Sequence, residues 1–166
     1  MFMNTWDFFF ARTTIPEWQI FLRLIIALLF GGAIGIDREV KNRPAGLRTH
    51  MLIALAASIF AVTTLEIIAE LEKRGHTGDP IRAIEAVTAG VAFLAAGSII
   101  QSRAQISGLT TGASMWLAGA IGVSCGFGLF TIAFLATALA LMVLVWLQTL
   151  TRKINSASTS DSTKHE

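Results

Sequence analysis

Residues 18–36 decide the fold class: they read WQIFLRLIIALLFGGAIGI and carry a single charge, Arg23. A helix that crosses the hydrocarbon core of a bilayer needs about 20 mostly apolar residues. Four further stretches have the same character, namely residues 49–69, 84–100, 110–126 and 127–150. Because lipid offers no water to backbone polar groups, each of these segments is expected to be helical. The sequence therefore predicts an all-α, polytopic transmembrane helical bundle of about five spans.

The composition of the whole chain agrees with this prediction. Hydrophobic residues make up 54% of the 166 residues and charged residues 14%, against about 25% charged residues in soluble domains. The net charge of +2 does not indicate a nucleic-acid-binding protein, and a single Cys excludes an internal disulfide. We predict an interfacial N-terminal segment over residues 1–17, a transmembrane domain over 18–150 in contact with the lipid bilayer, and a disordered polar tail over 151–166.

The basic residues predict the orientation of the bundle, because Lys and Arg in short loops favour the cytoplasmic side. Placing the loop between the first two spans on that side puts eight basic residues inside and four outside. The N-terminus is then outside and the C-terminus inside. The inner set is Arg38, Lys41, Arg43, Arg48, Arg103, Arg152, Lys153 and Lys164, and the outer set is Arg12, Lys73, Arg74 and Arg82.

The densest group of polar residues lies between the first two spans. Asp37, Arg38 and Glu39 end the first span, and the sequence RPAGLR follows at residues 43–48. Its Pro and Gly predict a turn, which would bring Asp37 and Glu39 near Arg43 and Arg48. Charge-assisted pairs in a partly dry interface are stronger than exposed ones. Two interpretations stay open: a rigid polar network that binds a partner or ligand, and positive-inside anchoring combined with helix capping.

Four pieces of sequence occur in order along the chain: GGAIGIDRE at 31–39, RPAGLRTH at 43–50, GVAFLAAGSII at 90–100 and SGLTTGASMWLAGAIGVSCGFG at 107–128. Together they resemble the membrane domain of the MgtC/SapB family of bacterial inner-membrane proteins. Ala92 and Ala95 stand where Gly is typical of the family, and Thr110 stands where some members have Asn. The chain also ends soon after the fifth predicted span, without the soluble C-terminal domain of longer members.

The resemblance implies a multi-pass protein of the bacterial inner membrane. We expect this protein to be non-enzymatic and to have no cofactor. It implies a role in growth under magnesium limitation and, in pathogens, in virulence. It also implies action through other inner-membrane proteins, such as an ATP synthase or a cation ATPase, rather than magnesium transport itself.

The polar loop and the resemblance together give a candidate functional network. Cys125 enters it because longer family members carry an important Cys in a similar Gly-rich context, although a lone Cys in a membrane helix is usually a small packing residue. The predicted network consists of Asp37, Arg38, Glu39, Arg43, Arg48, Thr110, Trp116 and Cys125.

Small residues recur at four-residue spacing in three of the predicted spans, and such stripes allow close approach of helices. They predict either internal packing or a seam between copies of a homo-oligomer. The stripes are Gly31 and Gly35, Ala86 and Gly90, and the series Ser114, Ala118, Gly122 and Gly126.

Charged residues near the predicted outer side suggest further hypotheses. Arg23 inside the first span is expected to snorkel or to pair with Glu66 or Glu85. The acidic residues at positions 66, 70, 72, 79 and 85 are interpreted as a solvated loop rather than a weak divalent-cation sensor.

The sequence contains no HExxH motif and no phosphate-cradling Gly-Lys motif, and its His residues lack the spacing of a zinc site. A membrane regulator is the leading hypothesis. The alternatives are a small oligomeric ion transporter or channel subunit, with Arg23 or Glu85 along the path, and an assembly scaffold.

Overall fold

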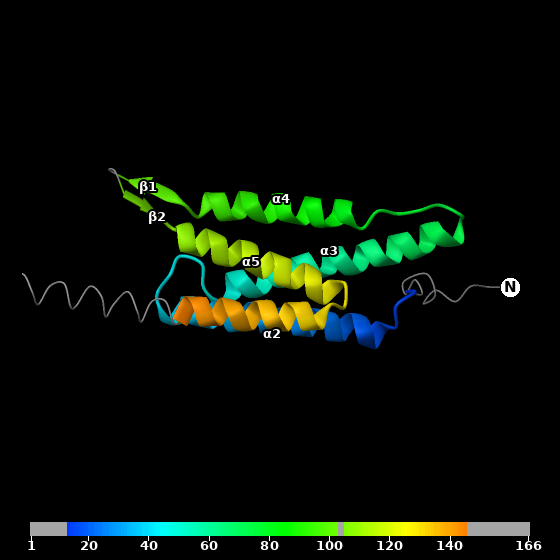
Figure 1. Cartoon of the computed structure of the whole chain (residues 1–166), viewed down its shortest axis with the longest axis horizontal. Coiled ribbons are helices and arrows are strands. Elements are labelled where there is room, and N and C mark those ends of the chain that lie inside the picture. The colour runs from blue at the N-terminus through cyan, green and yellow to red at the C-terminus, as the bar shows by residue number, and fades with distance from the viewer. Residues whose placement is uncertain (1–12, 103–104, 146–166) are drawn as a thin grey trace, which may run out of the picture.

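The computed structural model describes residues 13–102 and 105–145. Over these residues the chain forms a bundle of helices that lie side by side, with a short β-hairpin at one end (Figure 1). The helical fold class is therefore confirmed for the described residues. In chain order the elements are α2 (Glu17–Val40), α3 (Leu47–Lys73), α4 (Ile81–Gly97), β1 (Ile100–Ser102), β2 (Gln105–Ser107), α5 (Leu109–Gly126) and a last described helix, Phe130–Val145.

Two of these helices, α2 and α3, are long and apolar enough to cross a membrane by length and composition. The helix Phe130–Val145 is apolar but shorter. The number of spans and their orientation stay predictions. Most of the predicted 1–17 segment, all of the 151–166 tail and residues 146–150 of the fifth predicted span lie outside the described residues.

The third predicted span is shorter than the sequence indicated. The prediction placed it at 84–100, but α4 ends at Gly97, and Ile100 pairs with Ser107 in the antiparallel β1–β2 hairpin. Ser98 Oγ donates a hydrogen bond of 2.7 Å to the carbonyl of Ala95, a local side-chain bond of the kind that competes with helix continuation. The link that contains Arg103, itself outside the described residues, thus carries a hairpin.

The turn predicted around Gly126 and Gly128 is confirmed. Helix α5 ends at Gly126, and Gly128 has a φ of 80°, a left-handed conformation that favours glycine. The next helix therefore turns back directly, and Phe30 of α2 packs against Phe134 with their ring centroids 6.4 Å apart.

Small residues bring α2, α3 and α5 into close contact. A Cβ atom at Gly122 would lie 2.8 Å from the Cα of Ala54 on α3, and one at Gly31 would lie 2.7 Å from the Cβ of the same Ala54. A Cβ at Gly126 would lie 3.0 Å from the Cα of Ser58. The stripes on α2 and α5 therefore serve internal packing.

The stripe on α4 differs, because Ala86 and Gly90 are exposed and a Cβ at Gly90 would meet no atom within 4 Å.

The contrast between Gly122, which is packed against α3, and Gly90, which is open, gives a test of the packing. We expect Gly122→Ala to lower the free energy of unfolding by about 1–3 kcal/mol, because the added methyl group must push α5 away from the α3 backbone. Gly90→Ala is the matched control and is expected to be neutral or slightly stabilising, since Ala is a better helix former than Gly. Unfolding of the purified protein in detergent measures both variants, and equal stability of the two would contradict the close contact.

Candidate functional site

The bundle has two polar ends. We call the hairpin end the one that carries the 41–46 loop, the β1–β2 hairpin and the N-terminus of α5, at the left of Figure 1. The opposite end carries the start of α2, the end of α3 and the turn at 127–129. Six of the eight predicted site residues belong to the hairpin end: Asp37, Arg38, Glu39, Arg43, Arg48 and Thr110, the second residue of α5.

Arg38 is the central residue of the hairpin end. It lies in the last turn of α2, and only 1% of its surface is exposed. Its Nη2 donates a hydrogen bond of 3.2 Å to Oγ1 of Thr111 on α5. Its Nε and Nη1 have no partner among the described residues. A buried guanidinium with one hydrogen bond is far from the five donor bonds it can form.

His50 on α3 continues this group of polar residues and is fully buried. Its Nδ1 donates a hydrogen bond of 2.8 Å to the carbonyl of Gly46, and its Nε2 lies 3.0 Å from Ser114 Oγ. Ser114 Oγ in turn donates to the carbonyl of Thr111 at 2.8 Å. Arg38, Thr111, Ser114 and His50 therefore form one buried polar network that joins α2, α5 and α3.

Sequence reasoning did not select Thr111, Ser114 or His50. Thr111 and Ser114 are three residues apart on a helix, and Gly46 and His50 are four apart, so each pair lies on one helix face. Polar residues at this spacing inside an apolar stretch are the signal that could have identified them.

Asp37 and Glu39 do not form the ion pairs that the sequence predicted. Asp37 Oδ1 pairs with Lys41 Nζ at 2.6 Å, one helical turn away, and the same Nζ donates to the carbonyl of Leu144 at 3.0 Å. Glu39 Oε2 accepts a hydrogen bond of 2.8 Å from the backbone N–H of Leu47. Within the described part of the chain, neither Arg43 nor Arg48 forms an ion pair.

Other groups compete with Arg43 and Arg48 for the carboxylates of Asp37 and Glu39. Lys41 is nearer to Asp37 along the helix than any arginine of the loop, and the start of α3 needs an acceptor for its free N–H groups. The N-cap residue, Gly46, has no side chain to supply that acceptor. Glu39 supplies it from α2, and a Cβ atom at Gly46 would collide with the Glu39 carboxylate. Both exposed arginines, Arg43 and Arg48, are left facing solvent.

Three predicted site residues on α5 lie apart from the buried polar network: Thr110, Trp116 and Cys125. Thr110 is exposed beside the groove between α5 and the last described helix. Trp116 is 46% exposed and lines a cavity of about 270 Å³ between α4 and α5. Cys125 is fully buried near the opposite end, in the same core cluster as Ala27 and Ala54. The position of Cys125 supports its interpretation as a packing residue.

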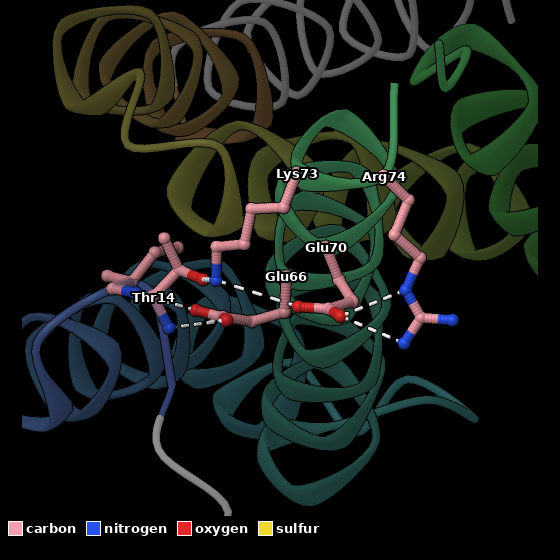
Figure 2. A network of polar contacts seen from close by, with 6 residues as sticks. Thr14, Glu66, Glu70, Lys73 and Arg74 are labelled. Carbon is pink, nitrogen blue, oxygen red and sulfur yellow. Dashed lines mark hydrogen bonds and ion pairs between the residues drawn. The ribbon is translucent and has the colours of Figure 1, made fainter. Parts of the chain in front are cut away.

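The opposite end is held by a carboxylate that binds backbone N–H groups (Figure 2). Glu66 Oε2 accepts from the N–H of Thr14, and its Oε1 accepts from the N–H of Ile15, both at 2.7 Å. Glu70 pairs with Arg74 at 2.9 Å and with Lys73 at 3.6 Å. The two hydrogen bonds to Glu66 fix the segment before α2 onto the end of α3, whereas the Glu70 pairs lie within one turn at the end of α3.

Arg23 forms no ion pair with Glu66 or Glu85, the two partners that the sequence suggested, and its snorkelling stays a prediction. Arg23 Nη1 donates a hydrogen bond of 2.8 Å to the carbonyl of Gly126 at the C-terminus of α5, where the helix dipole favours a cation. Glu66 is occupied by backbone groups, and Glu85 is exposed on α4. The described residues contain no group of three His, Cys, Asp or Glu side chains that could hold a metal ion.

Two neighbouring threonines allow a test of the buried polar network. Thr111→Val keeps the shape of the side chain but removes the one acceptor of Arg38, and we expect it to lower the free energy of unfolding by about 1–3 kcal/mol. Thr110→Val on the exposed side of the same turn is the control and should change it little. Thermal unfolding of both purified variants in detergent checks this, and a Thr111→Val protein as stable as the parent would contradict the role of this hydrogen bond.

Comparison with known proteins adds a separate line of evidence. Residues 24–153 match the model of the MgtC family. The Escherichia coli K12 protein named "Putative magnesium transporter YhiD" is 36% identical over 127 residues, which cover 76% of this chain and 59% of YhiD.

Two other relatives give similar values. Protein SrpB of Synechococcus elongatus is 35% identical over 131 residues, or 74% of this chain and 71% of SrpB. Protein MgtC of Salmonella typhimurium strain 14028s is 34% identical over 134 residues, or 81% of this chain and 54% of that protein. The chain thus spans little more than half the length of YhiD and of this MgtC. No solved structure matches it.

Proposed function

Because the chain belongs to the MgtC family, we propose that it is a non-enzymatic, multi-pass regulator in the bacterial inner membrane, which supports growth at low magnesium through contacts with other membrane proteins. The magnesium connection is supported by the name of its relative YhiD and by the resemblance described above. Partners of the class of an ATP synthase or a cation ATPase follow from that resemblance.

The observation that carries this proposal is the buried polar network at the hairpin end. Hydrogen bonds from Arg38, Thr111, Ser114 and His50 join three helices, and Glu39 fixes the start of α3. The loop between α2 and α3 is therefore held in one position, and it presents Arg43 and Arg48 without ion-pair partners among the described residues. A rigid surface with unpaired positive charge suits docking to an acidic surface of a membrane partner.

A transporter or channel subunit is the second candidate, favoured by the printed name of YhiD. The residues that would line its path do not converge, since Arg23 is bonded to Gly126 and Glu85 is exposed on α4. The groove between α3 and α4, about 500 Å³ in volume, is lined almost wholly by apolar residues such as Ile53, Phe60 and Leu94. Ion pathways through membranes ordinarily carry polar or ionisable groups, so this geometry favours the regulator.

The regulator proposal predicts a growth phenotype for the hairpin end. Arg38→Gln and Glu39→Gln should each abolish rescue at low magnesium of a bacterial strain that lacks its own protein of this family. The first variant removes the charge that joins α2 to α5, and the second removes the carboxylate that fixes the loop. Arg82→Gln at the exposed start of α4 is the charge-matched control and should rescue normally. Immunoblots of membrane fractions establish that all three proteins insert, and full rescue by both Arg38→Gln and Glu39→Gln would refute the assignment.

A flux measurement decides between the two candidates. Purified protein in liposomes should move neither magnesium nor protons if it acts only through partners. Transport that is lost in Glu85→Gln would make the transporter the better account.

A further inference from the structure

His50 is a buried titratable side chain whose titration plays no part in the proposed function. Both of its ring nitrogens face oxygen atoms: Nδ1 lies 2.8 Å from the carbonyl of Gly46, and Nε2 lies 3.0 Å from Ser114 Oγ. A carbonyl oxygen can only accept, so Nδ1 carries a proton. The direction of the second hydrogen bond depends on the hydroxyl of Ser114, which also lies 2.8 Å from the carbonyl of Thr111.

A count of protons gives His50 and its partners two complete arrangements. In the first, His50 is neutral, and the Ser114 hydroxyl donates its single proton to Nε2. In the second, His50 is a cation, Nε2 donates to Ser114 Oγ, and the hydroxyl donates to the Thr111 carbonyl. Because a hydroxyl can both donate and accept, the same heavy-atom positions serve both arrangements. The network can therefore take up one proton without leaving a polar atom of His50 or Ser114 unpaired.

Ser114 also connects His50 to a groove. It lines the space of about 390 Å³ between α5 and the last described helix, as does Thr110. These two residues are four apart on α5 and so lie on one face of it. Thr110 is exposed in the first turn of α5, at the hairpin end. Protons from water at this polar edge of the groove reach Nε2 through the hydroxyl of Ser114.

The charges around His50 determine what this proton does. Arg38 on α2 acts electrostatically on His50, and its Nη2 donates to Thr111, whose carbonyl Ser114 contacts. Neither α5 nor the helix Phe130–Val145 contains a charged residue. A proton on His50 therefore places a second cation beside Arg38, and like charges in close proximity repel. The other described charged side chains at the hairpin end lie on α2, in the loop or at the start of α3: Asp37, Glu39, Lys41, Arg43 and Arg48.

Asp37 offers the guanidinium of Arg38 a second partner. The Asp37 carboxylate acts electrostatically on Arg38. Its Oδ1 pairs with Lys41, but its Oδ2 is buried and has no hydrogen-bond partner among the described residues. Nε and Nη1 of Arg38 are buried and open in the same sense. Open donors and an open acceptor of opposite charge on neighbouring residues favour their approach.

We infer that His50 is a proton-operated switch at the hairpin end. With His50 neutral, Arg38 stays bonded to Thr111 and joins α2 to α5. With His50 protonated, Arg38 turns from Thr111 toward Asp37, and the contact between α2 and α5 loosens. The switch is a property of the chain itself, so it depends neither on a partner nor on the regulatory role.

Nuclear magnetic resonance of the full chain in detergent, with ¹⁵N-labelled histidine and arginine, tests the switch in the parent protein. At about pH 8, where imidazole is neutral, we expect the proton of His50 on Nδ1, the opposite of the tautomer that prevails for imidazole in water. The exposed His76 is the internal control and should show the ordinary tautomer. On acidification the Nε–H signal of Arg38 should shift in step with the titration of His50. A neutral His50 that carries its proton on Nε2, or an Arg38 signal that stays unchanged while His50 titrates, would overturn the switch.

Thermal unfolding separates the switch from a merely structural role of His50. We expect the unfolding temperature of the parent protein to fall by a few degrees between about pH 7.5 and 5.5, because protonation sets two cations side by side. His50→Gln keeps one donor and one acceptor but cannot take up the proton, so this fall should disappear. His76→Gln is the matched control and should retain it. An equal fall in His50→Gln and in the parent protein would contradict the switch, and if His50→Gln does not fold, the resonance titration of the parent protein decides.

Discussion

The close approach of α5 to α3 is the constraint on which the rest of the structure depends. At Gly122 and Gly126 the α5 backbone lies against the backbone of Ala54 and Ser58, with no room for a side chain. In lipid, apolar residues gain little by leaving the solvent for each other, so helices associate through close packing and interhelical hydrogen bonds. Only at this separation does Ser114 come within hydrogen-bond distance of His50. The glycines and the buried polar network are thus parts of one arrangement.

Three charged side chains bind backbone groups near the ends of neighbouring helices. Glu39 accepts from the start of α3, Arg23 donates to the end of α5, and Glu66 accepts from the residues before α2. Each helix end has free N–H or carbonyl groups that need partners. In all three cases the side chain belongs to one helix and its backbone partner lies at the end of another helix or just before it. Arg38 departs from this scheme, because it is a cation at the positive end of α5.

The local parts of this arrangement could be predicted from the sequence, and the partner choices could not. Apolar length is a property of a contiguous segment, so the helices and the turn at Gly128 were found. The end of α4 was misplaced because an apolar run such as Ile99–Ile100 suits a helix and a strand equally. Asp37 and Glu39 were assigned to the correct end of the bundle but to the wrong partners, since Lys41 and the backbone at Leu47 are visible as competitors only in three dimensions.

Three of the four segments that carry the family resemblance meet in the buried polar network at the hairpin end. GGAIGIDRE contributes Arg38, RPAGLRTH contributes Gly46 and His50, and SGLTTGAS contributes Thr111 and Ser114. Taken singly, each segment could serve an ordinary purpose, such as capping a helix or supplying small residues that allow close helix packing. Taken together, they build a continuous polar connection through three helices that are apolar almost everywhere else. Packing alone does not need such a connection, since apolar residues of similar volume would fill the space without the cost of burying polar groups. A site that must hold or sense a charged group does need it, and this difference is why the hairpin end, rather than Cys125 or Trp116, is the place to look for the activity of the protein.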